Sequence, residues 1–151
     1  MKKVVSVLLV VCLLFFVITA GALYALWGWT DDSAEKADVF AFVCENEEAL
    51  VSAIETGELT AYENTGIVKT ITVREAVVEF SCGGAGLGSG TSYVGFYYTP
   101  DDDMTAVWCA PFSEDSLRPS GNGYEWQEAN GDNCYYTEHI CGQFYYYEAG
   151  F

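Results

Sequence analysis

The stretch YEWQEANGDNCYYTEH, residues 124–139, decides the fold class of this chain. Asn130-Gly131 at its centre is the strongest short signal for a β-hairpin. Aromatic and β-branched residues dominate the runs on either side of that turn, which is typical of strands. Alternation along such a hairpin groups four residues on one face: Tyr124, Trp126, Tyr135 and Thr137. We expect the three aromatic members of this group to lie in the core.

Similar strand patterns continue outward from this hairpin. They occur at residues 67–73, 76–81, 91–99, 104–109 and 143–148. Turn residues separate them, and Pro100 followed by Asp101 is the order that a tight reverse turn favours. The glycine-rich run at residues 83–90 lacks the spacing of a phosphate-binding loop, so we interpret it as a flexible hairpin loop. The sequence therefore predicts about six to seven antiparallel strands.

A helical pattern precedes the strands, at about residues 39–56. Its apolar residues recur at spacings that fit one helix face: Phe40, Val43, Leu50 and Ile54. Asp38 is the expected N-cap and Gly57 the expected end. The predicted fold class is α+β, with one amphipathic helix packed on an antiparallel sheet or sandwich. We place this domain at residues 38–151, after a polar tether at 31–37.

The turn after Pro100 also predicts an aromatic strip. If it joins residues 91–99 to residues 104–109 as a hairpin, then Tyr93, Tyr97 and Trp108 share the face away from the helix. Packing against a second sheet is the favoured interpretation of this strip. A contact with another protein and stacking against sugar rings are the two functional alternatives.

Residues 1–30 have the features of a membrane anchor. No charged residue occurs from Val4 to Trp29, Lys2 and Lys3 precede this run, and Asp31 follows it. The positive-inside rule then leaves the N-terminus in the cytoplasm and the domain outside. A secretory signal cleaved near Ala22 is the alternative, and either interpretation places the domain outside the cytoplasm.

The charge balance limits the partners. With 6 Lys+Arg and 22 Asp+Glu, the formal net charge is 6 − 22 = −16. This argues against binding to nucleic acid, which requires a basic surface. An acidic surface favours a basic protein partner, although solubility alone also explains it.

The cysteines and the single histidine do not form a recognisable reactive motif. Cys134 and Cys141 are the best candidates for a local disulfide, with packing as small core residues as the alternative. The chain has no C-x-x-C motif, and we expect His139 to make a local hydrogen bond. The sequence predicts no metal site, no cofactor and no catalytic residue.

The layout also resembles short uncharacterised exported proteins, anchored in the membrane, of anaerobic Gram-positive (clostridial) bacteria. The resemblance is carried by the N-terminal segment and by the following stretches: FAFV at 40–43 with Asn46, GFYYTPDD at 95–102, GNGYEW at 121–126, GDN at 131–133, YTE at 136–138 and YYYE at 145–148. It implies a compartment and an architecture and carries no activity.

These observations lead to a non-enzymatic function as the expectation. A protein-interaction role at the cell surface is the leading hypothesis. A carbohydrate-binding module that uses the aromatic strip is the alternative, and a small hydrolase is third.

Overall fold

The computed structural model describes residues 12–23, 32–74, 77–86, 90–106 and 116–151. The chain divides into two compact units, Met1–Asp31 and Asp32–Phe151. In the first unit, the described helix covers residues 12–23, which is about 18 Å at about 1.5 Å per residue. No helix in the described part of the chain combines the length and the apolar character needed to cross a membrane. Residues 1–11 and 24–31 lie outside the description, so the membrane anchor expected in residues 1–30 stays a prediction.

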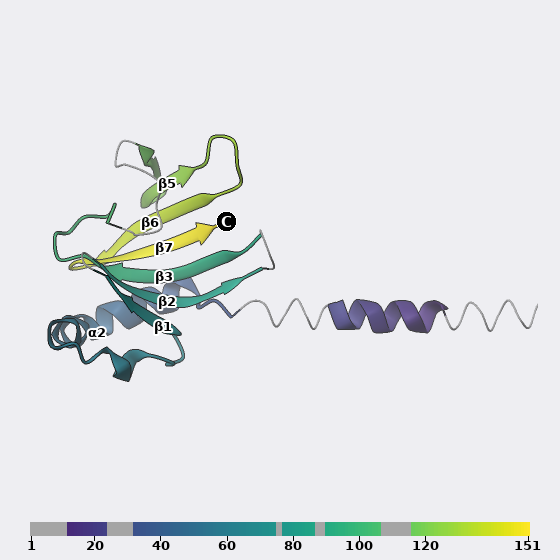
Figure 1. The fold of residues 1–151 in the computed structure, drawn as a ribbon, viewed down its shortest axis with the longest axis horizontal. Helices are drawn as coiled ribbons and strands as arrows, with labels where there is room; N and C mark the ends of the chain where they lie inside the picture. Colours follow the sequence, from purple (N-terminus) through teal and green to yellow (C-terminus); the bar gives the residue numbers. More distant parts are fainter. Residues whose placement is uncertain (1–11, 24–31, 75–76, 87–89, 107–115) are drawn as a thin grey trace, which may run out of the picture. The chain divides into compact units, whose positions relative to one another are not determined.

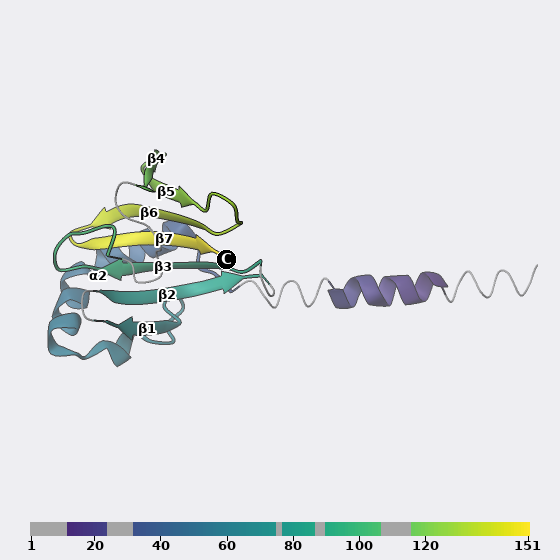
Figure 2. The same cartoon turned by 45° about the horizontal axis from the view of Figure 1, so that its top comes forward.

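The second unit is an α+β fold with one antiparallel sheet (Figure 1). The elements in chain order are α2 (Lys36–Thr56), the 3-10 helix η1 (Leu59–Tyr62), β1 (Thr70–Val73), β2 (Val78–Ala85), β3 (Ser92–Tyr98), β4 (Arg118–Ser120), β5 (Gly123–Gln127), β6 (Cys134–Cys141) and β7 (Phe144–Gly150). The seven strands have the order β1-β2-β3-β7-β6-β5-β4. The described strands form a single sheet rather than a sandwich, and Figure 2 shows its strands side by side.

Helix α2 extends the predicted helix by three residues at its N-terminal end. The N-cap is Glu35 rather than Asp38, which instead lies in the first turn, where a carboxylate is favourable to the helix dipole. Gly57 ends the helix as predicted, because its φ of 75° suits the left-handed conformation that closes many helices. The buried positions Val39, Val43 and Leu50 have helical spacing, so α2 presents one apolar stripe to the sheet.

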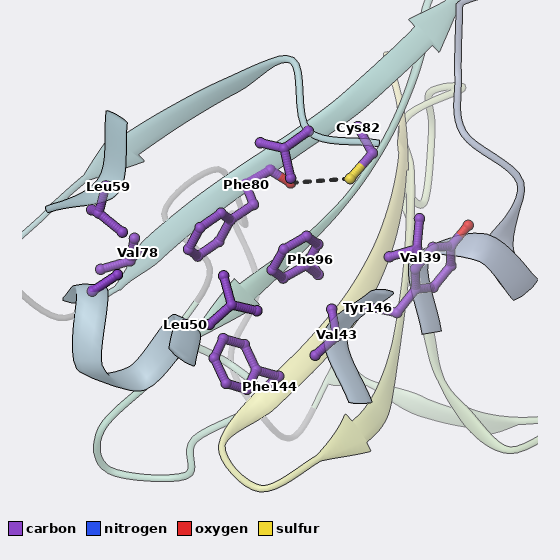
Figure 3. Packing of buried hydrophobic residues seen from close by; sticks show 12 residues of the cluster. Val39, Val43, Leu50, Leu59, Val78, Phe80, Cys82, Phe96, Phe144 and Tyr146 are labelled. Carbon is purple, nitrogen blue, oxygen red and sulfur yellow. Dashed lines mark hydrogen bonds between the residues drawn. The ribbon is translucent and has the colours of Figure 1, made fainter. Parts of the chain in front are cut away.

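The main core lies between α2 and one face of the sheet (Figure 3). Phe80 and Phe96 stack there with ring centroids 4.5 Å apart, and Phe144 meets Phe96 edge-on at 6.2 Å. Val43 and Leu50 pack on these rings from α2. Burial of this apolar surface, at about 25 cal/mol per Å², holds the helix against the sheet.

The hairpin predicted at Asn130-Gly131 is confirmed. Strands β5 and β6 pair so that Tyr124 is opposite Thr137 and Trp126 is opposite Tyr135. Tyr135 is buried and Trp126 packs against buried residues, as expected of core positions. Tyr124 differs from the expectation, because its side chain is 38% exposed on the short outer part of the sheet.

The hairpin predicted after β3 is wrong, although its turn forms. The backbone N–H of Asp102 donates to the carbonyl oxygen of Thr99 at 3.2 Å, which closes the reverse turn. However, β3 pairs with β2 on one side and with β7 on the other, so no edge is left for residues 104–109. Residues 104–106 form a turn and an irregular segment, and residues 107–109 lie outside the description.

Candidate functional site

The sheet surface turned away from α2, here called the opposite face, is partly covered by the segment that follows β3. The Tyr97 hydroxyl donates to the carbonyl oxygen of Met104 at 2.7 Å, and the Tyr145 hydroxyl donates to Asp102 Oδ1 at 2.6 Å. The two tyrosine rings stack with centroids 5.4 Å apart. This half of the opposite face is therefore a second core rather than a binding surface.

The other half of the opposite face is hollowed into a groove of about 690 Å³. It extends over β1, β2, β3 and β7, and it combines aromatic rings, hydroxyl groups and one carboxylate. The lining residues are Thr70, Thr72, Glu79, Ser81, Tyr93, Tyr147, Ala149 and Phe151. Its volume is within the range of roughly 300–1,000 Å³ that small-molecule sites occupy.

Strand alternation explains why these side chains gather in the groove. Thr70 is opposite Ser81 and Thr72 is opposite Glu79, so the polar side chains of β1 and β2 share a face. The residues between them, such as Ile71 and Phe80, turn toward the core under α2 instead. The same period of two thus builds the core on one side and a row of oxygen atoms on the other.

Tyr147 forms part of the groove wall because β3 carries a glycine beside it. A Cβ atom at Gly95 would lie 2.8 Å from Tyr147 Cε1, which is closer than real Cβ contacts. The ring can therefore lie flat across β3, and its hydroxyl donates to Glu79 Oε1 at 2.7 Å. This hydrogen bond sets the position of the Glu79 carboxylate, which remains half-buried at the groove.

Two exposed aromatic rings border the groove. Tyr93 is 44% exposed and Phe151 is 40% exposed, and their ring centroids are 6.2 Å apart. Two backbone hydrogen bonds between Thr91 and Phe151 continue the pairing of β3 with β7 and hold the two rings together. Aromatic rings held open to solvent in this way are available for stacking against a ligand.

The predicted aromatic strip is divided by the structure. Tyr93 lies at the groove, whereas Tyr97 is fully buried in the second core. Trp108 lies outside the described residues. The roles of Glu79, Phe151 and the hydroxyl row were not predicted from the sequence. The alternation of polar and apolar residues in 70–73 and 78–81 was a signal for Glu79 and the hydroxyl row.

A second groove of about 450 Å³ lies near β5, β6 and β7. Glu125 and Glu148 both line it, and Tyr136 of the intervening strand is paired with each of them. Because neighbouring strands are about 4.8 Å apart, the backbones of these two residues are about 9.6 Å apart. The Tyr146 hydroxyl donates to Glu148 Oε1 at 2.8 Å, so this carboxylate is held within the sheet network.

One lysine lies within an aromatic cluster beside α2. Lys36 Nζ is 4.7 Å from the ring centroid of Tyr136 and 5.1 Å from that of Tyr146, and it forms an ion pair with Glu138. Burial opposes the charge of Lys36, but its hydrogen bonds to Glu138 and Tyr136 outweigh burial and raise the pKa of Lys36. The same ion pair outweighs burial at Glu138 and lowers the pKa of its carboxyl group. The lysine thus fills a cation site that its own domain provides.

The predicted disulfide between Cys134 and Cys141 does not fit the fold. The two residues are the first and the last of β6, so about 23 Å of extended strand separates them. This distance exceeds the Cα separation of about 4.4–6.8 Å that a disulfide requires. The Cys141 thiol instead approaches Cys44 of α2.

His139 makes the local hydrogen bond that we expected, between Nε2 and the carbonyl oxygen of Gly142 at 2.9 Å. Within residues 12–23, 32–74, 77–86, 90–106 and 116–151, no cluster of three or more histidine, cysteine or acidic side chains is arranged to hold a metal ion. The glycine-rich run was predicted to be a hairpin loop, but its first three residues, 83–85, belong to β2. The rest of the run lies between the paired strands β2 and β3, with residues 87–89 outside the description.

Comparison with models of protein families, with curated proteins and with solved structures found no match. The groove must therefore be interpreted from its own chemistry.

Proposed function

We propose that the domain Asp32–Phe151 is a non-catalytic carbohydrate-binding module that holds its ligand in the groove of the opposite face. The observation that carries this proposal is the position of two exposed rings, Tyr93 and Phe151, beside a row of hydroxyl groups and the Glu79 carboxylate.

A sugar ring matches this arrangement in two ways. Its C–H groups form a weakly positive, apolar face, which the negative face of an aromatic ring attracts. Its hydroxyl groups lie around the rim, where they can donate to Glu79 and exchange hydrogen bonds with Thr72 and Ser81. A ligand without both features would use only half of the groove.

The charge of the chain narrows the class of sugar. A formal net charge of −16 repels acidic polysaccharides at low ionic strength. We therefore assign the groove to neutral sugars or amino sugars, whose hydroxyl or ammonium groups can donate hydrogen bonds to Glu79.

The test is a binding titration of the full chain with soluble neutral and amino-sugar oligosaccharides. Tyr93→Ala is expected to weaken binding by at least about tenfold, equivalent to about 1.4 kcal/mol. Tyr124→Ala is the matched control, because Tyr124 is similarly exposed at 38% and lies on the same face outside the groove. Equal binding by both variants and the unchanged chain, or no binding to any of these sugars, would contradict the proposal.

A contact with a basic protein is the second candidate function. Helix α2 carries exposed acidic side chains at spacings of seven, three and seven residues, which place them within one arc of the helix surface: Asp38, Glu45, Glu48 and Glu55. A partner recognised by this stripe would be released as salt is raised. Replacing Glu45 and Glu48 by Gln would weaken such a contact and leave sugar binding unchanged.

The location of the domain outside the cytoplasm is part of this proposal and rests on the sequence. The uncharged run from Val4 to Trp29 after two lysines supports a membrane anchor, or a signal that is cleaved near Ala22. Protease treatment of intact cells tests it, since an exported domain is digested without lysis.

A further inference from the structure

Two cysteines that are distant in the sequence meet at one end of the sheet. Cys44 lies in α2 and Cys141 ends β6, 97 positions later, and their Sγ atoms are 3.2 Å apart. Both are free thiols in this structure. A disulfide has an S–S length of about 2.05 Å, so the two sulfur atoms need to approach by only about 1.1 Å.

The fold determines this proximity, because each cysteine is positioned by rigid neighbours. Cys44 follows Val43, which is fully buried in the core beneath α2. Cys141 is paired with Phe144 across the tight β6–β7 turn, and Phe144 is fully buried in the same core. The packed core thus holds the two sulfur atoms close together in the folded chain.

We propose that Cys44 and Cys141 form a thiol pair that small or protein disulfides oxidise, which joins α2 covalently to β6. In the first step, the Cys44 thiolate attacks one sulfur of a disulfide RSSR, and a Cys44–S–S–R bond forms as RS⁻ leaves. In the second step, the Cys141 thiolate attacks Cys44 Sγ and displaces the second RS⁻. The two protein thiols lose two electrons to RSSR, and their two protons end on the two released RSH molecules.

The surroundings of the pair assign these roles. Cys44 is exposed, so a disulfide from solution can reach it, whereas Cys141 is only partly accessible. Burial, together with the hydrogen bond to Cys44 and the charge of Glu47, raises the pKa of Cys141 to about 12. Cys141 is therefore the poorer first nucleophile, and its role as the resolving thiol rests on its position next to Cys44.

The other described cysteines of the domain are placed differently. Cys82 is fully buried on β2, and burial raises the pKa of its thiol to about 12. Cys134 lies at the far end of β6 from Cys141. Cys134 is exposed but lies away from Cys44 and Cys141. It therefore serves as an internal control for the reaction of an accessible thiol outside the pair.

The test is oxidation of the purified, reduced full chain with oxidised glutathione under native conditions. Remaining thiols are then blocked by alkylation, and the digested peptides are identified by mass spectrometry. We expect one linked product in which Cys44 and Cys141 are joined, with a mass lower by two hydrogen atoms than that of the two reduced peptides. Cys134 should carry glutathione or the alkyl group instead.

Three matched variants complete the experiment. Cys44→Ser and Cys141→Ser should each abolish the linked product, and in Cys141→Ser the glutathione should remain on Cys44. Cys134→Ser should leave the linked product unchanged. Because Cys44 is exposed, Cys44→Ser is expected to fold, which far-UV circular dichroism checks.

Two outcomes would overturn the proposal. One is the recovery of Cys44 and Cys141 as separate glutathione or alkyl adducts from folded protein. The other is an equal yield of the linked product in denaturant, because proximity would then not depend on the fold. A lower yield in denaturant, with mixed pairings among the cysteines, would support it.

Discussion

Replacing Tyr97 by Phe tests the division of the opposite face into a covered half and a groove. Tyr97 and Tyr93 lie on the same strand and on the same face, four positions apart. Tyr97 is fully buried, whereas Tyr93 is 44% exposed. Loss of the hydroxyl group is therefore expected to matter at Tyr97 and not at Tyr93.

The expected magnitude follows from the contacts of the Tyr97 hydroxyl. It lies 2.7 Å from the carbonyl oxygen of Met104 and 2.8 Å from Thr137 Oγ1. Thr137 is fully buried, so water cannot replace the lost partner. A hydrogen bond contributes about 0.5–1.5 kcal/mol and a buried polar group left without a partner costs about 1–3 kcal/mol, so we expect a loss of about 2–3 kcal/mol.

Urea denaturation of the full chain, monitored by circular dichroism, measures this loss in the free energy of unfolding. With an unfolding entropy of about 2.1 cal/mol/K per residue, a domain of about 120 residues should melt about 8–12 °C lower. Tyr93→Phe is the matched control and should change the free energy of unfolding by less than about 0.5 kcal/mol. Equal effects of the two variants would refute the assignment of Tyr97 to a covered core.

Three further predictions concern stability. Burial, followed by hydrogen bonds to neighbouring carboxylates, raises the pKa values of Tyr145 and Tyr146, so the folded chain keeps both protonated while the unfolded chain ionises near pH 10. These groups should thus leave the free energy of unfolding unchanged below about pH 10. Above about pH 10, each should lower it by about 1.4 kcal/mol per pH unit. A free energy of unfolding, measured by urea denaturation, that stays constant up to about pH 11 would contradict this. Oxidation of Cys44 and Cys141, which are 97 positions apart, should stabilise the fold by up to about 4.7 kcal/mol, and chemical denaturation that shows equal stability before and after oxidation would contradict the constraint. Phe96→Ala should cost about 3–5 kcal/mol because the ring is fully buried against other aromatic rings, and a loss under about 1 kcal/mol on urea denaturation would show that the core can refill the space.

Local signals in the sequence were sufficient for the elements that depend on neighbouring residues. Asn130-Gly131 correctly located the hairpin between β5 and β6, although the loop covers residues 128–133 and neither residue has the positive φ of a two-residue hairpin turn. Gly57 fixed the end of α2 through its backbone conformation. The N-terminal end of α2 was less certain, since Glu35 caps it without a side-chain hydrogen bond and leaves no strong signal.

Pairing between distant segments could not be read from the sequence. The turn after Tyr98 forms as predicted, but β3 takes β7 as its partner, with Tyr98 opposite Phe144. Aromatic pairs across these two strands stabilise that choice, and they depend on residues almost fifty positions apart. The same limit hid the approach of Cys44 to Cys141, and it hid the packing of Tyr97 against Tyr145 and its hydrogen bond to Met104.

The order of the strands has a consequence for synthesis of the protein. Strand β7 is the last in chain order, yet it occupies the middle of the sheet between β3 and β6. Two separate three-stranded pieces, β1–β3 and β4–β6, are therefore made first, and each exposes the strand edge that β7 will later occupy. Folding of the sheet cannot finish before β7 has been made, and a chain shortened before Phe144 would lose the strand that joins the two pieces.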